Sequence, residues 1–475
     1  MAELPTDTRR EIASFVREWM SEANVPGASL AVTDRNEVVY ADGFGSRDLA
    51  SNAPATPTTL YGFGSVTKSF TALAVLQGVE NGWFDLSDSI ADHTPAAFDG
   101  AEEVTLHQLL THTSGLPSLG TSEVLIARQG GAGEHGIPLG DMDDVYAHVD
   151  GAGDERDAHS EGRFMYNNEG YVLLADAVER ASGRRFADYF DREILDSLGM
   201  ERSRLLSDHL PGPDANSDGD GDGDGDGNGS GEDTVDVMTP YRPGENGPQE
   251  ASLPVRELSH GPGGLFGTVG ELAAYLRYHL SGGEPFSDGT QLVDPDLLSR
   301  AHEGHVDTPS GPYGYGWRTR EIAGRRLIGH GGSIMVSTAY VGFLPEEGLG
   351  VAIACNVGAR PHPTQVAEGI VAILQDEDPA DVVPYYAYRD RIDPLLGRYE
   401  AYAGIREATV EERDGVLWVT LENGIDERTV ALVPEDLDAW QFRTRTRGGR
   451  QSAVGFVETD DGIDLFLERL RLHQI

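Results

Sequence analysis

Residues 64–70 read Gly-Ser-Val-Thr-Lys-Ser-Phe and contain Lys68, the only lysine among 475 residues. A buried ammonium can lose its proton near neutral pH, whereas a guanidinium effectively cannot. Ser65 stands three residues before Lys68, so this stretch pairs a candidate nucleophile with a candidate general base. Residues 70–79 are apolar almost all round, which predicts that the pair begins a buried helix. The alternative is that lysine was depleted by base composition or salt adaptation and the last one survived by chance.

The charge of the chain is strongly acidic, with 80 Asp and Glu against 36 Lys and Arg and a formal charge of −44. Such a charge repels itself at low salt, but in molar salt the Debye length falls to about 3 Å. Acid excess with arginine in place of lysine indicates a protein of a high-salt cytoplasm. An acidic surface that binds cations or basic partners is the alternative. Nucleic acid is excluded as a partner, because its phosphates would be repelled.

The length and the 39% hydrophobic content allow two or three domains with a sizeable core. Cys355, the single cysteine, lies in an apolar run and is interpreted as a core residue, so no internal disulfide or cysteine metal site is expected. The first 20 residues are charged and amphipathic, and no stretch approaches 18 apolar residues. We therefore expect a cytoplasmic protein without a membrane partner.

Local patterns predict the elements of a large first domain, residues 1–378. Residues 6–23 are predicted to be a helix, since apolar residues recur at i, i+3, i+4 and i+7 from Ile12. Residues 28–33 and 37–43 are predicted to form a hairpin. Helical patterns separated by loops fill residues 100–205, and a further helix is expected near 269–280. Later strands are predicted at residues 314–319, 325–328, 337–343 and 350–356.

The last part of the chain has a different pattern. After a linker at residues 379–389, short strand candidates recur about every ten residues, which is typical of a small antiparallel barrel or sandwich over residues 390–475. The candidates are residues 399–402, 409–412, 417–421, 429–434, 439–444, 454–458 and 464–467.

Residues 213–233 are dominated by Asp-Gly dipeptides and are interpreted as a disordered, solvated surface loop. A calcium loop is the alternative, because Asp222, Asp224, Asp226 and Gly227 match the first half of an EF-hand loop. Asp233 would then stand where the bidentate Glu belongs, but glycine-rich flanks replace the required helices.

Three further motifs accompany the Ser65–Lys68 pair. Residues 164–168 read Phe-Met-Tyr-Asn-Asn before a helical run, residues 261–266 read Gly-Pro-Gly-Gly-Leu-Phe, and residues 328–333 read Ile-Gly-His-Gly-Gly-Ser before a strand. Taken alone, each has a structural interpretation. Tyr166 would be a half-buried core residue, Asn168 a helix cap, and His330 part of a turn.

Together, in this order, these motifs resemble the serine beta-lactamase and penicillin-binding-protein superfamily, in its class C-like branch of D-peptidases and carboxylesterases. Members of that branch carry Ser-x-x-Lys, then Tyr-x-Asn, then Lys-Thr-Gly or His-x-Gly. The resemblance covers about residues 8–375 and includes Leu-His-Gln-Leu-Leu-Thr-His-Thr-Ser-Gly-Leu at 106–116 and Tyr-Gly-Tyr-Gly-Trp at 313–317. It implies an α+β fold, an antiparallel sheet flanked by helices with a helical subdomain, and a site between them. The C-terminal domain resembles the lipocalin-like barrel of some members.

The resemblance also implies roles. Ser65 would attack an acyl carbon and form an acyl-enzyme. Lys68, its pKa lowered by desolvation, and Tyr166 would carry protons, and which of them is the base in acylation stays open. Asn168 would hydrogen-bond Lys68 and the substrate.

An oxyanion hole would be formed by the backbone N–H groups of Ser65 and Ser333, worth about 3–4 kcal/mol each, with Gly332 beside them. His107 and His112 are interpreted as structural residues of the Thr-Ser-Gly-Leu loop. Neither a metal nor a cofactor is expected.

The triplet departs from that of true class C beta-lactamases, which is Lys-Thr-Gly, because His330 is followed here by Gly331 and Gly332. The lysine and hydroxyl that would grip a beta-lactam carboxylate are both missing. His330 is mostly neutral at pH 7 and could hydrogen-bond Tyr166 or a substrate. This favours hydrolysis of small esters or D-amino-acid peptides over a beta-lactamase proper. A catalytically retired scaffold that binds an acyl or peptide ligand is the remaining alternative, and a homo-oligomer formed through the C-terminal domain is left open.

Overall fold

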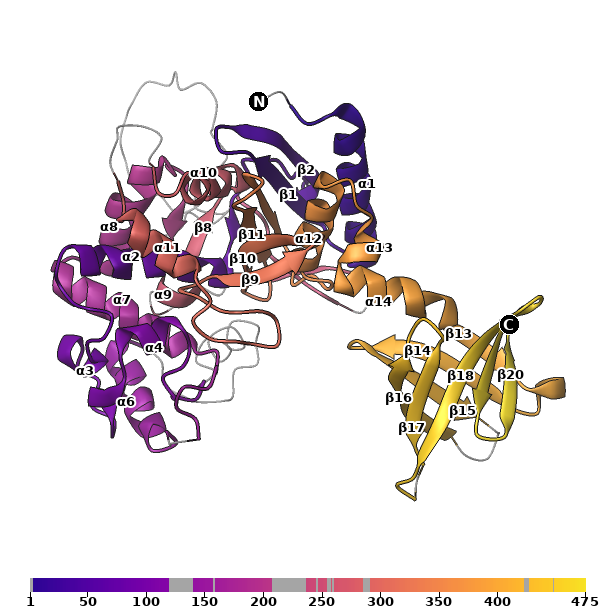
Figure 1. Ribbon diagram of the computed structural model, residues 1–475. Coiled ribbons are helices and arrows are strands. Elements are labelled where there is room, and N and C mark those ends of the chain that lie inside the picture. Colours follow the sequence, from indigo (N-terminus) through magenta and orange to yellow (C-terminus); the bar gives the residue numbers. More distant parts are fainter. Residues whose placement is uncertain are drawn as a thin grey trace, which may run out of the picture. The chain divides into compact units, whose positions relative to one another are not determined.

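The computed structural model describes residues 3–118, 140–156, 159–206, 236–244, 247–253, 258, 260–284, 291–422, 427–446 and 448–475. The Asp-Gly-rich tract at 213–233, with its candidate calcium ligands, lies outside these residues. The chain divides into two compact units, Met1–Gln375 and Asp376–Ile475 (Figure 1). No helix in the described part of the chain is both long and apolar enough to cross a membrane.

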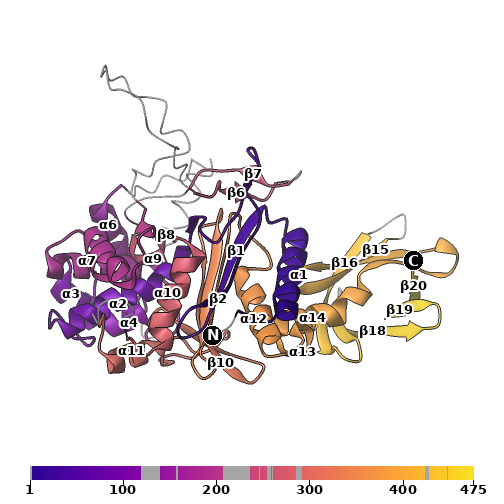
Figure 2. The same cartoon turned by 90° about the horizontal axis from the view of Figure 1, so that it is seen from above.

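The first unit is built on a seven-stranded antiparallel sheet in the order β3-β2-β1-β12-β11-β10-β9. Every residue of β1 and of β11 is buried, because helices cover both faces of the sheet. Helices α1 (Thr6–Glu22) and α12 (Pro363–Leu374) lie on one face, and α10 (Val269–Leu280) lies on the other (Figure 2). The strands are β1 Gly27–Thr33, β2 Val38–Asp48, β3 Ala53–Pro54, β9 Arg318–Ile322, β10 Arg325–Ser333, β11 Thr338–Leu344 and β12 Leu349–Cys355.

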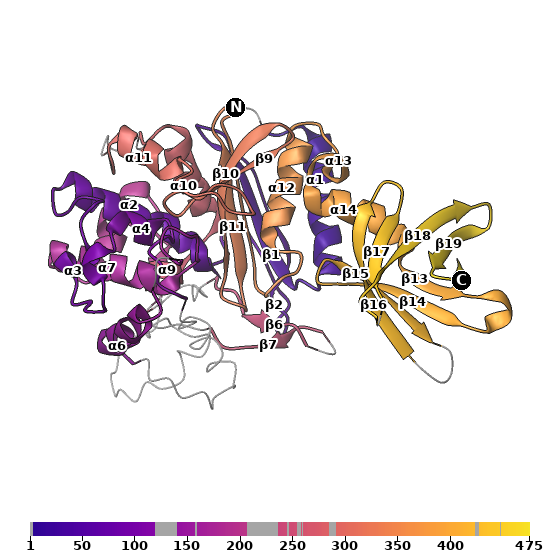
Figure 3. The same cartoon turned by 60° about the horizontal axis from the view of Figure 1, so that its bottom comes forward.

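Beyond α10 lies the helical part of this unit, centred on α2 (Thr67–Glu80) (Figure 3). Nearly all of α2 is buried, as its apolar sequence predicts, and it packs on α7 (Asn168–Ser182) and α9 (His260–Gly263). The remaining helices are α3 Ile90–His93, α4 Leu106–Leu110, α6 Met142–Gly153, α8 Phe186–Phe190 and α11 Pro295–His302.

One strand prediction in this unit was wrong. Residues 314–317 are not a strand, and the edge strand β9 begins only at Arg318. Gly316 has a φ of +73°, which interrupts an extended chain. The aromatic residues Tyr313, Tyr315 and Trp317 are buried in this loop, and their alternation with glycine imitates a strand pattern.

The segment that leads to Ser65 is held by strands too short for the sequence to indicate. Strand β4 (Tyr61–Gly62) pairs with β8 (Leu265–Gly267), which also pairs with β5 (Arg204–Leu205). Three segments distant in sequence therefore brace the approach to the predicted nucleophile.

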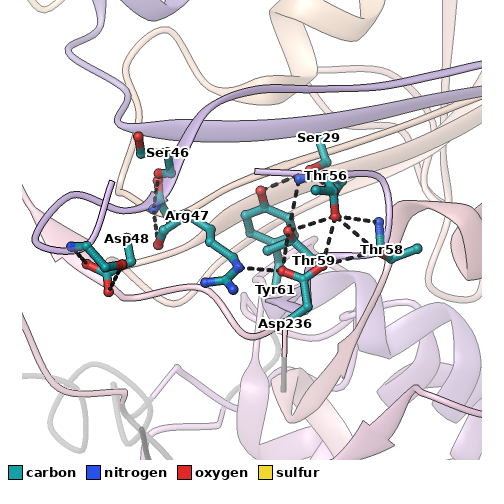
Figure 4. A network of polar contacts seen from close by, with 11 residues as sticks. Ser29, Ser46, Arg47, Asp48, Thr56, Thr58, Thr59, Tyr61 and Asp236 are labelled. Carbon is teal, nitrogen blue, oxygen red and sulfur yellow. Dashed lines mark hydrogen bonds and ion pairs between the residues drawn. The ribbon is translucent and has the colours of Figure 1, made fainter. Parts of the chain in front are cut away.

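Asp236 provides a second brace, shown in Figure 4. Its carboxylate accepts hydrogen bonds of 2.8, 3.0 and 2.9 Å from the hydroxyls of Thr56, Thr58 and Thr59. It also forms an ion pair of 2.5 Å with Arg47. Burial alone would raise the pKa of this carboxyl, but the threonine hydrogen bonds and Arg47 outweigh it and lower the pKa. Asp236 is therefore ionised. It links the chain from residue 236 onward to residues 56–59, which precede Tyr61.

The second unit contains a closed antiparallel barrel of eight strands, where the sequence predicted seven. The missed strand is the last, β20, which pairs with β19 and with β13 and so closes the barrel. Residues 379–389, assigned to a linker, lie in helices α13 (Pro379–Val382) and α14 (Pro384–Ile392). The strands are β13 Gly397–Glu400, β14 Glu407–Arg413, β15 Val416–Glu422, β16 Glu427–Asp436, β17 Gln441–Arg445, β18 Gln451–Thr459, β19 Gly462–Leu467 and β20 Leu470–Gln474.

Candidate active site

Ser65 lies in a single 3-10 turn, Gly64–Val66, that runs directly into α2. Lys68 follows one turn later on the same side, and its Nζ lies 3.0 Å from Ser65 Oγ. Gly64 is required before the serine, because its φ is +53° and a Cβ there would lie 2.6 Å from the backbone nitrogen of Ser333. The turn and the end of β10 are therefore in direct contact.

The ammonium of Lys68 is completely buried and is surrounded by acceptors. Besides contacting Ser65, Nζ donates to Asn168 Oδ1 at 2.7 Å and to the carbonyl oxygen of Pro262 at 2.8 Å. The amide and carbonyl oxygens can only accept, whereas the serine hydroxyl can also donate. Of these three partners, Ser65 is therefore the one that could pass a proton to a neutral Lys68.

Asn168 reaches Lys68 because the neighbouring asparagine caps the helix instead. Asn167 is the N-cap of α7, and its Oδ1 accepts from the backbone nitrogen of Gly170 at 2.9 Å. Its Nδ2 donates to the carbonyl oxygens of Leu116 and Pro117 at 3.2 and 3.0 Å. The capping role considered for Asn168 thus belongs to Asn167.

Tyr166 is positioned by His112, which does more than hold its own loop. The backbone nitrogen of Met165 donates to the His112 carbonyl at 2.8 Å, and that of Asn167 donates to His112 Nδ1 at 3.1 Å. The His112 ring packs on the Tyr166 ring with centroids 4.3 Å apart. Lys68 Nζ lies 4.8 Å from the centroid of the same tyrosine ring, so the two predicted proton carriers are adjacent.

His107 is half-buried, and its Nδ1 lies 2.8 Å from Tyr315 Oη. This contact joins α4 to the glycine-rich loop before β9. It fits the structural role that the sequence assigned to His107.

His330 is hydrogen-bonded to Tyr313, not to Tyr166. Its Nδ1 lies 2.6 Å from the Gly331 carbonyl oxygen, which can only accept, so Nδ1 carries the proton and Nε2 accepts from Tyr313 Oη at 3.0 Å. The rings of His330 and Tyr166 are 6.4 Å apart between centroids. Burial, with a smaller effect of nearby Lys68, lowers the pKa of His330 to about 3. The imidazole is therefore neutral at pH 7 and does not replace a cationic lysine.

The end of β10 lies against the turn that carries Ser65. A Cβ at Gly332 would be 1.9 Å from the Phe63 carbonyl oxygen and 2.9 Å from the Ser65 nitrogen, so only glycine fits. Ser333, the next residue, is exposed at the mouth of the site. The backbones expected to form the oxyanion hole are thus adjacent.

These groups meet at a cavity of about 350 Å³. Five predicted site residues line it, while Lys68 and Asn168 lie behind Ser65 and connect to it by hydrogen bonds. The lining residues are Ser65, Tyr166, Arg318, Arg320, Gly329, His330, Gly331, Gly332, Ser333, His362 and Thr364. Within the described residues, no group of three or more His, Cys, Asp or Glu side chains could hold a metal ion.

Sequence reasoning missed four of the lining residues, Arg318, Arg320, His362 and Thr364. The arginines alternate along the edge strand β9, so both side chains point to one face of the sheet. Burial lowers the pKa of Arg318, and the nearby Arg320 adds to this. Alternation of Arg318 and Arg320 was the only available signal, and the wrong strand boundary obscured it.

Family models and known proteins match both units of the chain. A family model described as Beta-lactamase matches residues 12–375, and one described as the Pab87 octamerisation domain matches residues 379–473. The structure of the octameric penicillin-binding protein homologue from Pyrococcus abyssi is similar with a TM-score of 0.84 and 30% sequence identity, covering 97% of this chain and 99% of that chain.

Two curated relatives are also similar. Penicillin-binding protein 4 of Amycolatopsis lactamdurans is 27% identical over 81% of this chain and 95% of its own length. Protein flp of Staphylococcus aureus (strain MW2) is 25% identical over 76% of this chain, and the match spans 66% of that relative. The resemblance inferred from the motifs and the α+β fold with its C-terminal barrel are confirmed, and the chain belongs to the beta-lactamase family.

Proposed function

We propose that this protein is a serine hydrolase that forms an acyl-enzyme on Ser65 and hydrolyses small esters or peptides. The contact that carries the proposal is the 3.0 Å approach of Lys68 Nζ to Ser65 Oγ in a buried setting. Ser65 is also the hydrogen-bond partner of Lys68 that lines the cavity, where a substrate could reach it. A general base needs this contact.

In the proposed reaction, Ser65 Oγ attacks the acyl carbon while neutral Lys68 takes the hydroxyl proton. The oxyanion that forms faces the backbone N–H groups of Ser65 and Ser333. The alcohol or amine leaves with a proton from the Lys68–Tyr166 pair. Tyr166 next passes its proton to neutral Lys68, and the phenolate takes a proton from water as the water attacks the acyl-enzyme. Lys68 then returns its proton to Ser65 Oγ as the acid departs, which restores neutral Lys68 and Tyr166.

The cavity wall favours substrates with a negative charge, because two guanidinium groups line it in a chain of formal charge −44. Arg320 Nε lies 3.3 Å from Glu368 Oε1, whereas the contacts of Arg318 are with neutral oxygens and aromatic rings. This supports peptides with a free carboxylate over neutral esters, and His330 supplies no charge that could do the same.

The barrel supports a second proposal, that copies of this chain assemble through it. The domain matches an octamerisation domain, and the similar Pyrococcus protein is octameric. Two of its large apolar side chains, Tyr402 and Ile405, lie three residues apart and are 89% and 70% exposed, and exposed apolar patches mark surfaces that a partner covers.

The test of the catalytic proposal is the intact mass after incubation with a fluorophosphonate in about 3 M KCl, a salt level that screens the acidic surface. Peptide mapping should place one adduct on Ser65, formed as Oγ displaces fluoride from phosphorus. Ser65→Ala should abolish the adduct. Ser310→Ala, at an exposed serine that does not line the cavity, should leave it unchanged. A folded protein without an adduct would identify a non-catalytic scaffold.

A further inference from the structure

Gly331 leaves a gap in the strand that lines the cavity, and side chains from another element fill it. A Cβ built at position 331 would lie 2.8 Å from Thr364 Oγ1 and 3.0 Å from His362 Cε1. All three residues line the cavity that contains Ser65. The hydroxyl of Thr364 therefore occupies the place that a side chain on β10 would otherwise take.

Helix α12 is fixed to β10 at this point by His362, its N-cap residue. The imidazole Nδ1 accepts from the Thr364 backbone nitrogen at 3.1 Å, so the ring proton is on Nε2, which donates to the Gly332 carbonyl at 3.1 Å. Burial lowers the pKa of His362 to about 4, which keeps this neutral form at pH 7. The helix start is thus held in register with the residue that follows Gly331.

The hydroxyl of Thr364 can donate a hydrogen bond to a substrate. Its Oγ1 lies 2.9 Å from His362 Nδ1, but that nitrogen already accepts the backbone N–H of the same threonine. Because a ring nitrogen has one lone pair, the two hydrogens compete for it. A substrate oxygen in the cavity would be the better acceptor for the hydroxyl.

A negatively charged oxygen would fit this position best. Arg318 lines the same cavity, and its described contacts are the Thr308 hydroxyl, the Gly311 carbonyl at 3.3 Å and the rings of Phe164 and Tyr313. Among the described residues it makes no ion pair. Its charge is thus balanced by aromatic faces rather than by a carboxylate.

We propose that Thr364, on α12, supplies the hydroxyl that β10 lacks at Gly331 and donates it to the anionic group of the substrate beside Arg318. Thr364 is then a specificity-determining residue, and it makes the protein prefer acyl compounds that carry a carboxylate. This inference rests on the proposed hydrolase function.

The test uses two substrates with the same scissile bond, one with a free carboxylate and one with a carboxamide in its place. In Thr364→Val, which keeps the shape and removes the hydroxyl, kcat/KM for the carboxylate substrate should fall about 10- to 150-fold, as for a lost hydrogen bond to a charged group. The value for the carboxamide should change less than about twofold, and Thr364→Ser should retain the preference. Equal losses for both substrates would show a structural role and overturn the proposal.

A second test moves the hydroxyl from Thr364 on α12 to position 331 on β10. Recovery of the carboxylate preference in the double variant would separate a loss of the hydroxyl from a folding defect. Gly331→Thr alone should impair the protein, because its side chain would meet Thr364 Oγ1. Thr364→Ala alone should lose the preference for the carboxylate, and Gly331→Thr with Thr364→Ala should regain it. A double variant that folds and turns over the carboxamide without regaining the preference would contradict the proposal.

The two proposals fail in distinguishable ways. If the wild-type protein gains no fluorophosphonate adduct on Ser65, both the hydrolase function and the Thr364 assignment are overturned. An adduct on Ser65, together with a preference for the carboxylate that Thr364→Val leaves intact, would overturn the Thr364 assignment alone.

Discussion

Both units of this protein bury an apolar core, but they differ in the polar side chains that they bury and the apolar side chains that they expose. Met1–Gln375 buries a lysine and four histidines, His112, His260, His279 and His330, whereas the buried polar side chains described in the barrel are Thr420, Thr444 and Asp464. Ten large hydrophobic side chains are exposed among the described residues, and seven of them lie in Asp376–Ile475, the smaller unit. They are Tyr402, Ile405, Val416, Val433, Val457, Phe466 and Ile475.

This difference indicates a division of labour. Buried polar groups are costly unless each is hydrogen-bonded, so a unit retains them where they are useful. Exposed apolar patches mark surfaces that a partner covers. Chemistry is therefore expected from the first unit and assembly from the second, and each prediction below tests one side of this contrast.

The largest effect is expected for Lys68→Arg. Arginine keeps the positive charge but cannot act as a base, so kcat/KM should fall by about 10³-fold or more. The rate of the Ser65 fluorophosphonate adduct measures the same loss independently of the substrate. Arg10→Lys, at a side chain that is 75% exposed, is the matched control and should change nothing. Full activity of Lys68→Arg would remove the basis for a catalytic first unit.

Tyr166→Phe should have the next largest effect, about 10²- to 10⁴-fold on turnover, because the proposed activation of water is lost. Since Lys68 remains, the acyl-enzyme should accumulate and be visible by intact mass. Tyr171 also lies near Lys68 and is buried, and its hydroxyl donates to the Leu110 carbonyl at 2.8 Å. Tyr171→Phe should therefore cost about 1 kcal/mol of stability with little loss of rate, and equal rate losses in both variants would contradict the assignment.

Acid should destabilise the first unit through a buried pair, His279 Nδ1 and His302 Nε2, which are 2.9 Å apart. Burial, with a smaller effect of Arg326, lowers the pKa of His302 from 6.5 to about 3. Below pH 6.5 His302 binds a proton in the unfolded chain but not in the folded unit, so the free energy of unfolding falls as pH falls. At pH 5 the loss from one such histidine is about 2 kcal/mol.

Calorimetry between pH 7.5 and about 5 measures the pH dependence of the free energy of unfolding. The range ends below the ordinary pKa of histidine, so the unfolded side chain becomes protonated within it. His302→Gln should reduce the pH dependence of the first unit's transition. His473→Gln, in the barrel, where the side chain is 41% exposed, should leave it unchanged. A pH dependence that His302→Gln does not alter would show that other groups dominate.

The smallest effect on activity is expected in the barrel. Tyr402→Ser with Ile405→Ser should shift sedimentation toward smaller species, because large apolar groups lose their partner surface. The kcat/KM per protomer should stay within about twofold, since the hydrogen-bonded cluster at Ser65 lies wholly within the first unit. Leu49→Ser, at a position in the first unit that is 45% exposed, is the control. An unchanged sedimentation coefficient would contradict the assignment of assembly to the second unit.

Parts of the fold that repeat a local pattern could be predicted from the sequence. The N-terminal helix, the first hairpin and the buried α2 follow from apolar periodicity, and most barrel strands follow from their spacing. Strand β20, Leu470–Gln474, was missed although it is as long as β17, because two residues separate it from β19 and the ten-residue spacing of the other candidates does not indicate it. Helices α13 and α14 lie where a linker was predicted from the change in sequence pattern, and the prolines at their first positions are a helix-start signal that this prediction did not use.

The sequence by itself determined the pairing of Ser65 with Lys68, because residues three apart on a helix share a face whatever surrounds them. It also predicted Tyr166, Asn168 and His330 as members of one site, through their order and resemblance, and the structure places all three at or next to the cavity. The tertiary structure alone decided the partners: Pro262 for Lys68, Tyr313 for His330, and Thr364 for the gap at Gly331. These contacts join residues of different elements, and local periodicity carries no information about which elements pack together.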